Sequence, residues 1–324
     1  MTTGVPAVPG TAGVPRAAQG GTDPFRATTG TPVVPPHPSR IDLHCHTDRS
    51  DGVLAPERLV RAAASAGIRL LAITDHDTLA GYRDLPASDG SQPVVIPGVE
   101  INSVAEGVEA LWEGELHVLG LGVDPDDEAL EGALASQRAR RVERFHAIVS
   151  RLRELGLSVD TEVADLRPAE GSSLGRPTLA RHLVAAGHAT SVDDAMRRIL
   201  ARGMPGYVPR VGLGPRAAIE AIRAAGGLPV LAHFADARVR RALVAELRDL
   251  GLGGLEVYYR HFSAEVVAEL RDVAGDLRLV PTGGSDYHGD VETYAEAHAR
   301  LYVPEAVAGL VHGALQGTAS TGFR

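Results

Sequence analysis

Short apolar runs alternate with segments of helical periodicity along most of this chain of 324 residues. Seven runs have the length and composition of β-strands: Ile41–Leu43, Leu70–Thr74, Val94–Val99, Leu116–Leu121, Pro229–Ala232, Leu255–Tyr258 and Leu279–Thr282. Helical segments follow several of these runs: Pro56–Ala66, Ala237–Leu250 and Ala264–Val273. Such alternation is typical of parallel strands joined by crossover helices. The sequence therefore predicts an α/β barrel or an open α/β sheet.

The alternation is interrupted by a long stretch of helical pattern between residues 125 and 226. Asp124-Pro125 has the composition of a helix cap followed by a first helical residue, and helical spacing continues to about Leu155. Three further helical patterns follow: Leu179–Ala186, Val192–Ala201 and Pro215–Ala225. We expect residues 125–226 to be a helical subdomain inserted into a barrel domain that comprises residues 40–124 and 227–324.

The remaining composition excludes several classes of protein. Residues 1–39 are rich in Gly, Pro, Thr and Ala without a hydrophobic period, so they are predicted to be a disordered leader. The chain contains neither the roughly 18–20 consecutive apolar residues of a membrane span nor a secretory signal. The single cysteine, Cys45, excludes an internal disulfide and favours the cytoplasm. A net charge of −9 argues against a stable complex with duplex nucleic acid, but not against a phosphate substrate held by metal ions.

Histidine and acidic residues follow the predicted strands, mostly where each strand ends. His44 and His46 end the first strand, and their side chains point to the same side because alternate residues of a strand share a face. The later strands complete a set of nine candidate metal ligands: His44, His46, Asp51, His76, Glu100, His117, His233, Asp286 and His288. Parallel α/β folds place their active sites at the C-terminal ends of strands, so we expect these side chains to meet.

Nine such groups exceed what one ion can bind, so the sequence predicts two or three divalent cations. A single strand histidine is more often structural than a ligand, but nine groups at successive strand ends are hard to reconcile with chance. Three ions would carry +6 against −3 from the carboxylates, and two ions would still leave a surplus of +1, so the site attracts an anion such as phosphate. Bound cations also polarise water toward hydroxide. The pattern therefore indicates metal-dependent hydrolysis of a phosphoester.

Five segments of the chain together resemble the four motifs of the PHP (polymerase and histidinol phosphatase) family. They are Asp42-Leu43-His44-Cys45-His46-Thr47 with Ser50-Asp51-Gly52, Thr74-Asp75-His76-Asp77, Gly98-Val99-Glu100, Ala232-His233 and Gly284-Ser285-Asp286-Tyr287-His288. The resemblance covers about residues 40–316 and matches all nine ligand positions. It implies a distorted seven-stranded (β/α)7 barrel with a trinuclear site, usually of Mn²⁺, Fe²⁺ or Zn²⁺.

The predicted insert is similar to that of the stand-alone TrpH-like branch of the family. It contains Gly175-Arg176-Pro177 and Tyr207-Val208-Pro209-Arg210. Members of that branch act on nucleoside 3′,5′-bisphosphates, nucleoside monophosphates or short RNA 5′ ends, which implies a phosphatase or exonuclease with a small phosphorylated substrate. Four candidate substrate contacts follow, with His261 also a candidate general acid: Arg176, Arg210, Arg260 and His261.

Departures from the sequence pattern of the branch leave the substrate open, and three alternatives to a nucleotide phosphoesterase are considered. Thr178, Phe234, Tyr259 and Phe262 stand where relatives often have other residues, and all four fall on the substrate side. A histidinol-phosphate-type phosphatase is an alternative, although it would lack such an insert. A metal-barrel amidohydrolase typically bridges its two metals with a carboxylated lysine, and this chain has no lysine. A non-catalytic barrel would not be expected to keep every ligand. The arginines of 138–144 are predicted to form a solvated helix face.

Overall fold

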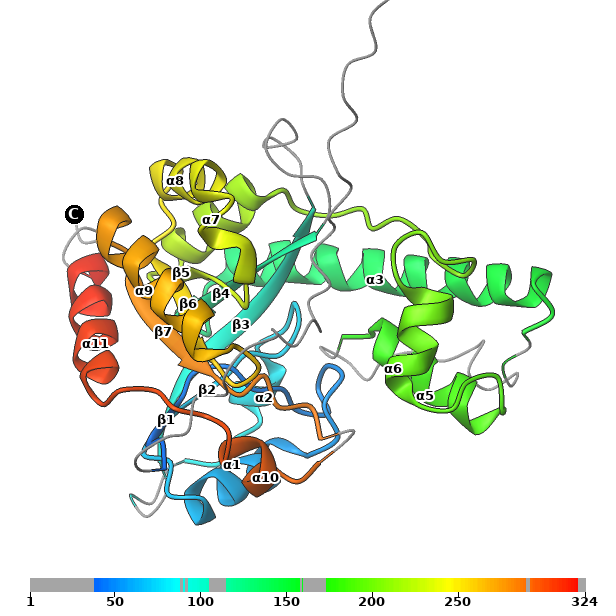
Figure 1. Ribbon diagram of the computed structural model, residues 1–324, viewed down its shortest axis with the longest axis horizontal. Coiled ribbons are helices and arrows are strands. Elements are labelled where there is room, and N and C mark those ends of the chain that lie inside the picture. Colours follow the sequence, from blue (N-terminus) through cyan, green and yellow to red (C-terminus); the bar gives the residue numbers. More distant parts are fainter. Residues whose placement is uncertain are drawn as a thin grey trace, which may run out of the picture.

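The computed structural model describes residues 38–87, 90, 93–104, 115–157, 159, 173–289 and 292–319. In this part of the chain, seven strands form one sheet in sequence order (Figure 1). They are β1 (Ile41–Asp42), β2 (Leu70–Ile73), β3 (Val94–Val104), β4 (Glu115–Leu121), β5 (Leu228–Leu231), β6 (Gly254–Tyr259) and β7 (Val280–Gly284). All seven strands occur where the sequence predicts them, with ends that differ by a few residues.

The segments that continue β1 and β7 meet and nearly close the sheet into a barrel. Leu43 N donates to Gly283 O over 3.1 Å, and Asp286 N donates to His44 O over 2.6 Å. Further along, Cys45 pairs with Tyr287 in a parallel bridge. The prediction of an α/β fold with a seven-stranded barrel is therefore confirmed, and the open sheet is excluded.

Strand β4 runs in the opposite direction to both of its neighbours, β3 and β5, whereas the other neighbouring strands are parallel. The expectation that all the strands are parallel is wrong here. The reversal decides where His117 lies, because it places the beginning of β4 beside the end of β3. His117 is the third residue of β4, and it pairs with Asn102 near the end of β3. It therefore lies at the same mouth of the barrel as the C-terminal ends of the other strands.

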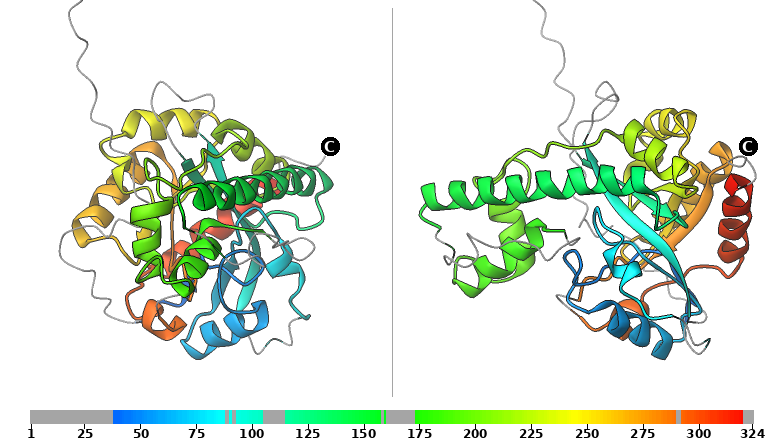
Figure 2. Two further views of the ribbon diagram at one scale, coloured as in Figure 1. Left: turned by 90° about the vertical axis from the view of Figure 1, so that its right-hand side faces the viewer. Right: turned by 180° about the vertical axis from the view of Figure 1, so that it is seen from behind.

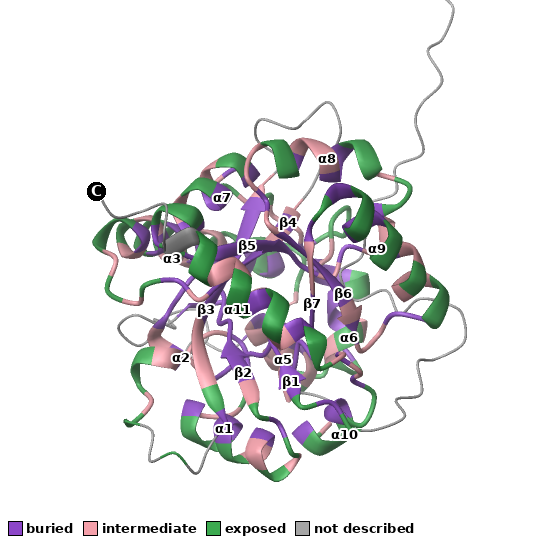
Figure 3. Ribbon diagram, turned by 90° about the vertical axis from the view of Figure 1, so that its left-hand side faces the viewer, coloured by how far each residue is buried: buried purple, intermediate pink, exposed green. Residues whose placement is uncertain are grey.

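Apolar side chains fill the barrel and a helix closes its other end. The interior cluster includes Leu43, Leu119, Leu121 and Val230, and α11 (Ala306–Ala319) adds Val307 and Val311 to it. Figure 3 shows α11 crossing this end of the strands. Outer helices cover the barrel wall and connect the strands: α1 (Pro56–Ser65), α2 (Ala80–Arg83), η2 (Ala235–Ala237), α8 (Arg241–Asp249), α9 (Ala264–Leu277) and α10 (Tyr294–His298). The mouth with the histidines is thus left uncovered by these helices.

The insert is built around the long helix α3 (Glu128–Glu154), which extends away from the barrel (Figure 2). Its N-cap is Asp127, whose side chain accepts from Leu130 N over 2.7 Å, so the predicted cap at Asp124-Pro125 is wrong by three residues. Leu130 and Leu134 at its beginning pack into the barrel core. Its second half packs in a separate core with three shorter helices: α5 (Arg176–Ala185), α6 (Val192–Ala195) and the π-helical turn η1 (Met196–Leu200).

The last helix of the predicted insert, α7 (Pro215–Ala224), packs on the barrel. Ile219 and Ile222 join the core that contains Val118 and Leu231. The separate core of the insert extends only from about residue 142 to residue 208. The predicted insert boundaries at residues 125 and 226 stay a prediction. Helix α7 lies within those boundaries, but its apolar residues belong to the barrel core.

The predicted leader, residues 1–39, lies outside the described residues except for Pro38 and Ser39. Ser39 is buried; its hydroxyl donates to Ile41 O over 2.8 Å, and its carbonyl accepts from His298 Nε2 over 2.7 Å. The ordered chain thus includes the residue before Arg40. Among the described residues, no helix combines the length and the apolarity that crossing a membrane requires.

Candidate metal centre

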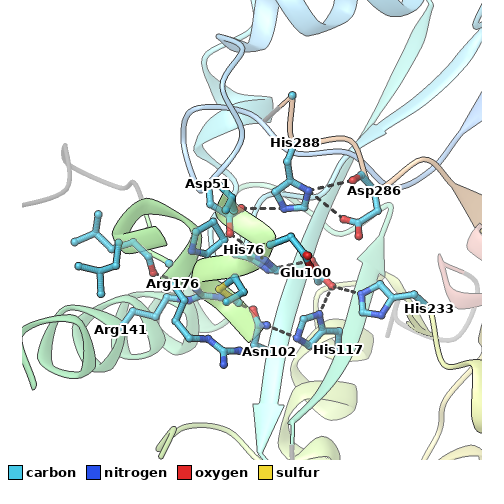
Figure 4. Close-up of a pocket in the computed structure, with 18 of the residues that line it drawn as sticks. Asp51, His76, Glu100, Asn102, His117, Arg141, Arg176, His233, Asp286 and His288 are labelled. Carbon is cyan, nitrogen blue, oxygen red and sulfur yellow. Dashed lines mark hydrogen bonds and ion pairs between the residues drawn. The ribbon is translucent and has the colours of Figure 1, made fainter. Parts of the chain in front are cut away.

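The nine candidate ligands come together at the open mouth of the barrel. Figure 4 labels all of them except His44 and His46. Their ligand atoms fall into three groups, and within each group the atoms lie within 4.8 Å of one another. The groups are His46, Asp51, His76 and His288; His44, His46, Glu100 and Asp286; and Glu100, His117 and His233. Two residues, His46 and Glu100, belong to two groups each. The three groups therefore form one continuous cluster that could hold metal ions.

Glu100 lies at the centre of the cluster, at the point where β3 passes the barrel mouth. Both of its carboxylate oxygens face imidazole nitrogens. Oε2 lies 3.4, 3.2 and 2.9 Å from His44 Nε2, His46 Nε2 and His76 Nδ1. Oε1 lies 2.7 and 3.2 Å from His117 Nδ1 and His233 Nε2. One carboxylate thus contacts five histidines, which come from the ends of β1, β2 and β5 and from β4.

Several of these atoms are buried and have no hydrogen-bond partner. Among the described residues they include His44 Nε2, His46 Nε2, His76 Nδ1 and Glu100 Oε2. A buried polar atom without a partner costs about 1–3 kcal/mol, so a native structure rarely leaves four of them facing one another. Imidazole nitrogens and carboxylate oxygens that converge in this way fit divalent transition-metal ions.

The carboxylates of the cluster are held in their ionised form. Burial would raise the pKa of Glu100, but His76 and His117 hold it well below its usual range. The pKa values of Asp51 and Asp286 are lowered in the same way by neighbouring histidines. Burial would lower the pKa of His46, yet the nearby carboxylates of Asp286 and Glu100 raise it to about 10. A cation that binds here must displace that proton, so metal binding should weaken as the pH falls.

Three further acids orient the ligands, and the sequence analysis missed all of them as site residues. His44 Nδ1 donates to Glu256 Oε1 over 3.1 Å, which directs His44 Nε2 into the cluster. Asp42 accepts from Ser285 and from Tyr294 Oη, over 2.6 to 2.8 Å. Asp75 accepts from Thr47 and Ser50 over 2.6 to 2.7 Å. The signal was present for Glu256, since a carboxylate inside the apolar run Leu255–Tyr258 needs a buried partner.

The backbone is strained at the same mouth. Asp77, His233 and Asp286 have φ values of 53°, 31° and 48°, in the left-handed region that costs energy for residues with a side chain. All three lie within four residues after the end of a strand. His233 and Asp286 contribute their side chains to the cluster, whereas the Asp77 carboxylate pairs with Arg141 and Arg210.

A cavity of about 400 Å³ opens beside the cluster, between the barrel and the insert. The structure places all four predicted substrate contacts on its wall: Arg176, Arg210, Arg260 and His261. Arg176 and Arg210 pair with acids of the barrel, Glu115 at 3.5 Å and Asp77 at 2.8 Å. Burial and the neighbouring Arg141 lower the pKa of Arg210 to about 10, which reflects the crowding of like charges on this wall.

The predicted solvated arginine face of α3 is wrong for three of its four members, since the Arg138 side chain is only 13% exposed and those of Arg141 and Arg144 are little exposed too. Arg141 and Arg144 line the cavity, with side chains only 7% and 10% exposed, whereas Arg140 is exposed. Arg141 donates to Asp77 and to Asn102 Oδ1, and Asn102 Nδ2 lies 2.5 Å from His117 Nε2. A spacing of three residues places Arg138, Arg141 and Arg144 on one helix face. That face turns inward because α3 bridges the barrel and the insert.

His261 is poorly suited to the role of general acid. Burial, aided by the neighbouring Arg260, lowers its pKa to about 4. Near neutral pH its imidazole therefore carries no proton that it could donate as an imidazolium. The structure keeps His261 at the cavity wall but argues against its use as the proton donor.

The insert contacts the cluster at the loop that carries Asp51. Arg181 on α5 donates from both terminal nitrogens to the carbonyl of Asp51, over 3.2 and 3.1 Å. Ser173 N donates to Arg49 O over 2.8 Å in the same loop. A Cβ on Gly175 would lie 3.0 Å from Asp51 Oδ2, so a side chain there would press on the candidate ligand.

Known proteins resemble this chain in sequence and in fold. The sequence model of the PHP domain matches residues 42–157. The 5′-3′ exoribonuclease Rnm of Salmonella typhimurium is 36% identical over 277 residues, which cover 83% of this chain and 92% of that protein. The chain belongs to the PHP family. It is accordingly a phosphoric ester hydrolase, and the resemblance inferred from the motifs is confirmed.

Two other PHP proteins cover most of the chain. The 3′,5′-nucleoside bisphosphate phosphatase of Chromobacterium violaceum is 31% identical over 259 residues, 78% of this chain and 89% of that protein. A crystal structure from Bifidobacterium adolescentis, described as that of a metal-dependent phosphoesterase, has a TM-score of 0.73 at 30% identity. It covers 86% of this chain and 98% of its own. This PHP member thus shares both its barrel and its insert with phosphoesterases.

Proposed function

We propose that this PHP protein hydrolyses phosphoesters of nucleotides with two or three divalent cations, Mn²⁺, Fe²⁺ or Zn²⁺, held by the three groups. The proposed ligands are His44, His46, Asp51, His76, Glu100, His117, His233, Asp286 and His288. The observation that carries the proposal is the set of buried, partnerless nitrogen and oxygen atoms that face one another around Glu100. Bound divalent cations supply Lewis-acid activation of a phosphoryl group and of water.

The arginine wall of the cavity supports a substrate with a second phosphate. Among the described residues, Arg141, Arg144, Arg176 and Arg210 form ion pairs with two acids, Asp77 and Glu115, which leaves two positive charges. A buried excess of charge is costly unless an anion compensates it. A phosphate dianion would balance the excess and would accept several charge-assisted hydrogen bonds.

The same cavity offers an apolar surface next to these charges. Seven of its lining residues are apolar and come from the insert: Phe145, Ile148, Leu174, Pro177, Leu179, Val192 and Met196. A nucleobase can pack on such a surface while its phosphates contact arginines and metal ions. Two relatives are named as a nucleoside bisphosphate phosphatase and an exoribonuclease. The substrates of both activities combine a nucleobase with phosphate groups.

Replacing Arg176 by alanine should reduce hydrolysis of a nucleoside bisphosphate selectively. The loss of one charge-assisted contact costs about 1.5–3 kcal/mol, or roughly ten- to a hundredfold in kcat/KM. Hydrolysis of p-nitrophenyl phosphate should change little, because this ester reaches only the metal ions. Steady-state kinetics with both substrates check the prediction. The control is Arg153→Ala, because Arg153 is an exposed residue near the end of α3 that does not line the cavity. Equal losses on the two substrates would show that Arg176 serves the fold or the metal cluster.

A panel of phosphoesters tests the function itself. Purified protein with Mn²⁺ should release phosphate from adenosine 3′,5′-bisphosphate or nucleotides from a 5′-phosphorylated oligonucleotide. Preference for histidinol phosphate would favour the alternative phosphatase and contradict the nucleotide substrate.

The amidohydrolase alternative is disfavoured by the lack of lysine. The single cysteine supports the proposed cytoplasmic location.

A further inference from the structure

The cavity has a second positively charged wall, separate from the arginines of the insert. It consists of Arg260, directly after β6, and Arg300, which follows α10. Arg260 Nη1 donates to Glu292 Oε1 over 2.6 Å, and Arg300 Nη2 donates to both carboxylate oxygens of Glu292 over 2.6 Å. One carboxylate thus holds two guanidinium groups together and leaves one positive charge.

The metal cluster lies between the two walls. Arg260 Nη2 donates to the backbone carbonyl of Asp286 over 3.3 Å. In Figure 4, Asp286 and His288 lie on one side of the cluster, and Arg141 and Arg176 lie on the opposite side. A substrate phosphate at the cluster would therefore have a cationic wall on each side of it.

Arg260 has unused capacity to donate. Its side chain is 10% exposed, and Nε has no hydrogen-bond partner in the described part of the chain. His261 next to it is uncharged near neutral pH, because its pKa is lowered to about 4 by burial and by Arg260 itself. A phosphate oxygen is the acceptor that a guanidinium group of this kind recognises.

The two walls differ in their access to solvent. On the insert side, the arginines are largely buried beneath α3 and α5, and the apolar residues of the insert close the cavity. On the other side, the Arg300 side chain is 50% exposed. The insert side suits the end of a substrate, and the Arg260–Arg300 side lets a longer substrate continue into solvent.

From this arrangement we infer that Arg260 and Arg300 form an anion subsite for the phosphate of the adjoining nucleotide in a single-stranded oligonucleotide. The inference rests on the proposed function and narrows its substrate class. The terminal phosphate binds to the insert arginines, the scissile phosphodiester lies at the metal cluster, and the next phosphate binds to Arg260 and Arg300. A nucleoside bisphosphate fills only the first two positions. The chain is then an exonuclease that also accepts bisphosphates.

The test compares Arg300→Gln with a matched control, Arg241→Gln. Arg241 is also 50% exposed and also pairs with a carboxylate, that of Asp276 at 3.4 Å, but it does not line the cavity. For the Mn²⁺-loaded full chain, kcat/KM is measured with adenosine 3′,5′-bisphosphate and with a short 5′-phosphorylated oligoadenylate over a range of salt concentrations. Equilibrium binding of the same oligoadenylate is measured before Mn²⁺ is added.

For Arg300→Gln, the loss with oligoadenylate should exceed the loss with the bisphosphate by about three- to tenfold, since the contact is charged but half exposed. Oligoadenylate binding should weaken to a similar extent. The slope of the logarithm of its binding constant against the logarithm of the salt concentration should become shallower by about 0.7, because one phosphate contact is lost. Arg241→Gln should behave as wild type in each assay.

Three results would overturn the inference: equal losses on both substrates, oligoadenylate binding by Arg300→Gln that matches that of Arg241→Gln, or a wild-type enzyme that cleaves the bisphosphate but not oligoadenylate. Failure of the proposed function is distinguishable, because it would abolish hydrolysis of both substrates by the wild type. The binding comparison would still decide whether the subsite exists.

Discussion

Replacing Glu100 by glutamine should lower kcat/KM for a phosphoester by about a hundredfold or more while the fold is retained. The amide has nearly the same shape as the carboxylate but removes the negative charge that faces five histidines. With that charge lost, neighbouring cations are bound less tightly, and a phosphate at the cluster is activated less. Steady-state kinetics and the far-UV circular dichroism spectrum together check the prediction.

Asp51→Asn should have a similar effect, because Asp51 is the carboxylate of the group with His76 and His288. Glu220→Gln provides a control, since Glu220 is an exposed residue of α7 that pairs with Arg216 at 3.8 Å and does not belong to the cluster. Near wild-type turnover in Glu100→Gln or Asp51→Asn would contradict the assigned site.

Removal of metal ions should abolish activity, and their return should restore it. The nine ligands form three groups, so elemental analysis of protein reloaded with Mn²⁺ should give at least two equivalents per chain. Ions that bind only the folded chain also stabilise it, by about 2.7 kcal/mol at a free concentration a hundred times Kd, so chelation should lower Tm.

The pH dependence gives a second check on the metal prediction. His46 has a pKa raised to about 10 in the absence of an ion, so protons compete with cations for the cluster. Apparent metal affinity should fall steadily as the pH is lowered from 8 to 6. A stoichiometry of one equivalent or fewer at the higher pH would exclude the multinuclear mechanism.

Much of the metal cluster could be predicted because it depends on strand ends. A residue at the end of a strand keeps its position whichever helix follows, so His44, His76 and His233 were identifiable from short local patterns. Glu100 was identified in the same way, although β3 continues past it to Val104. His117 was also identified as a candidate ligand, but its position on a predicted strand does not by itself explain why it lies at the mouth. Its place at the mouth depends on the reversal of β4, and the apolar run Leu116–Leu121 has the same composition in either direction.

The features that were missed depend on tertiary packing. Arg141 and Arg144 look like ordinary surface residues of α3 until the helix is seen to bridge the barrel and the insert. The same bridge explains why α7 shares the barrel core although its sequence continues the helical stretch. Glu256 and Asn102 orient ligands that are distant in sequence, and no local pattern connects them with those ligands.

The hydrogen bonds from Arg181 to the carbonyl of Asp51 have a consequence for how enzymes of this architecture can diverge. The helix α5 contributes Arg176 and Pro177 to the substrate cavity, and the same helix holds the loop of a candidate metal ligand. An exchange of the insert between two family members would therefore transplant part of the support of the metal cluster together with the specificity surface. We expect chimaeras that keep the recipient's loop around Asp51 to lose metal before they gain a new substrate.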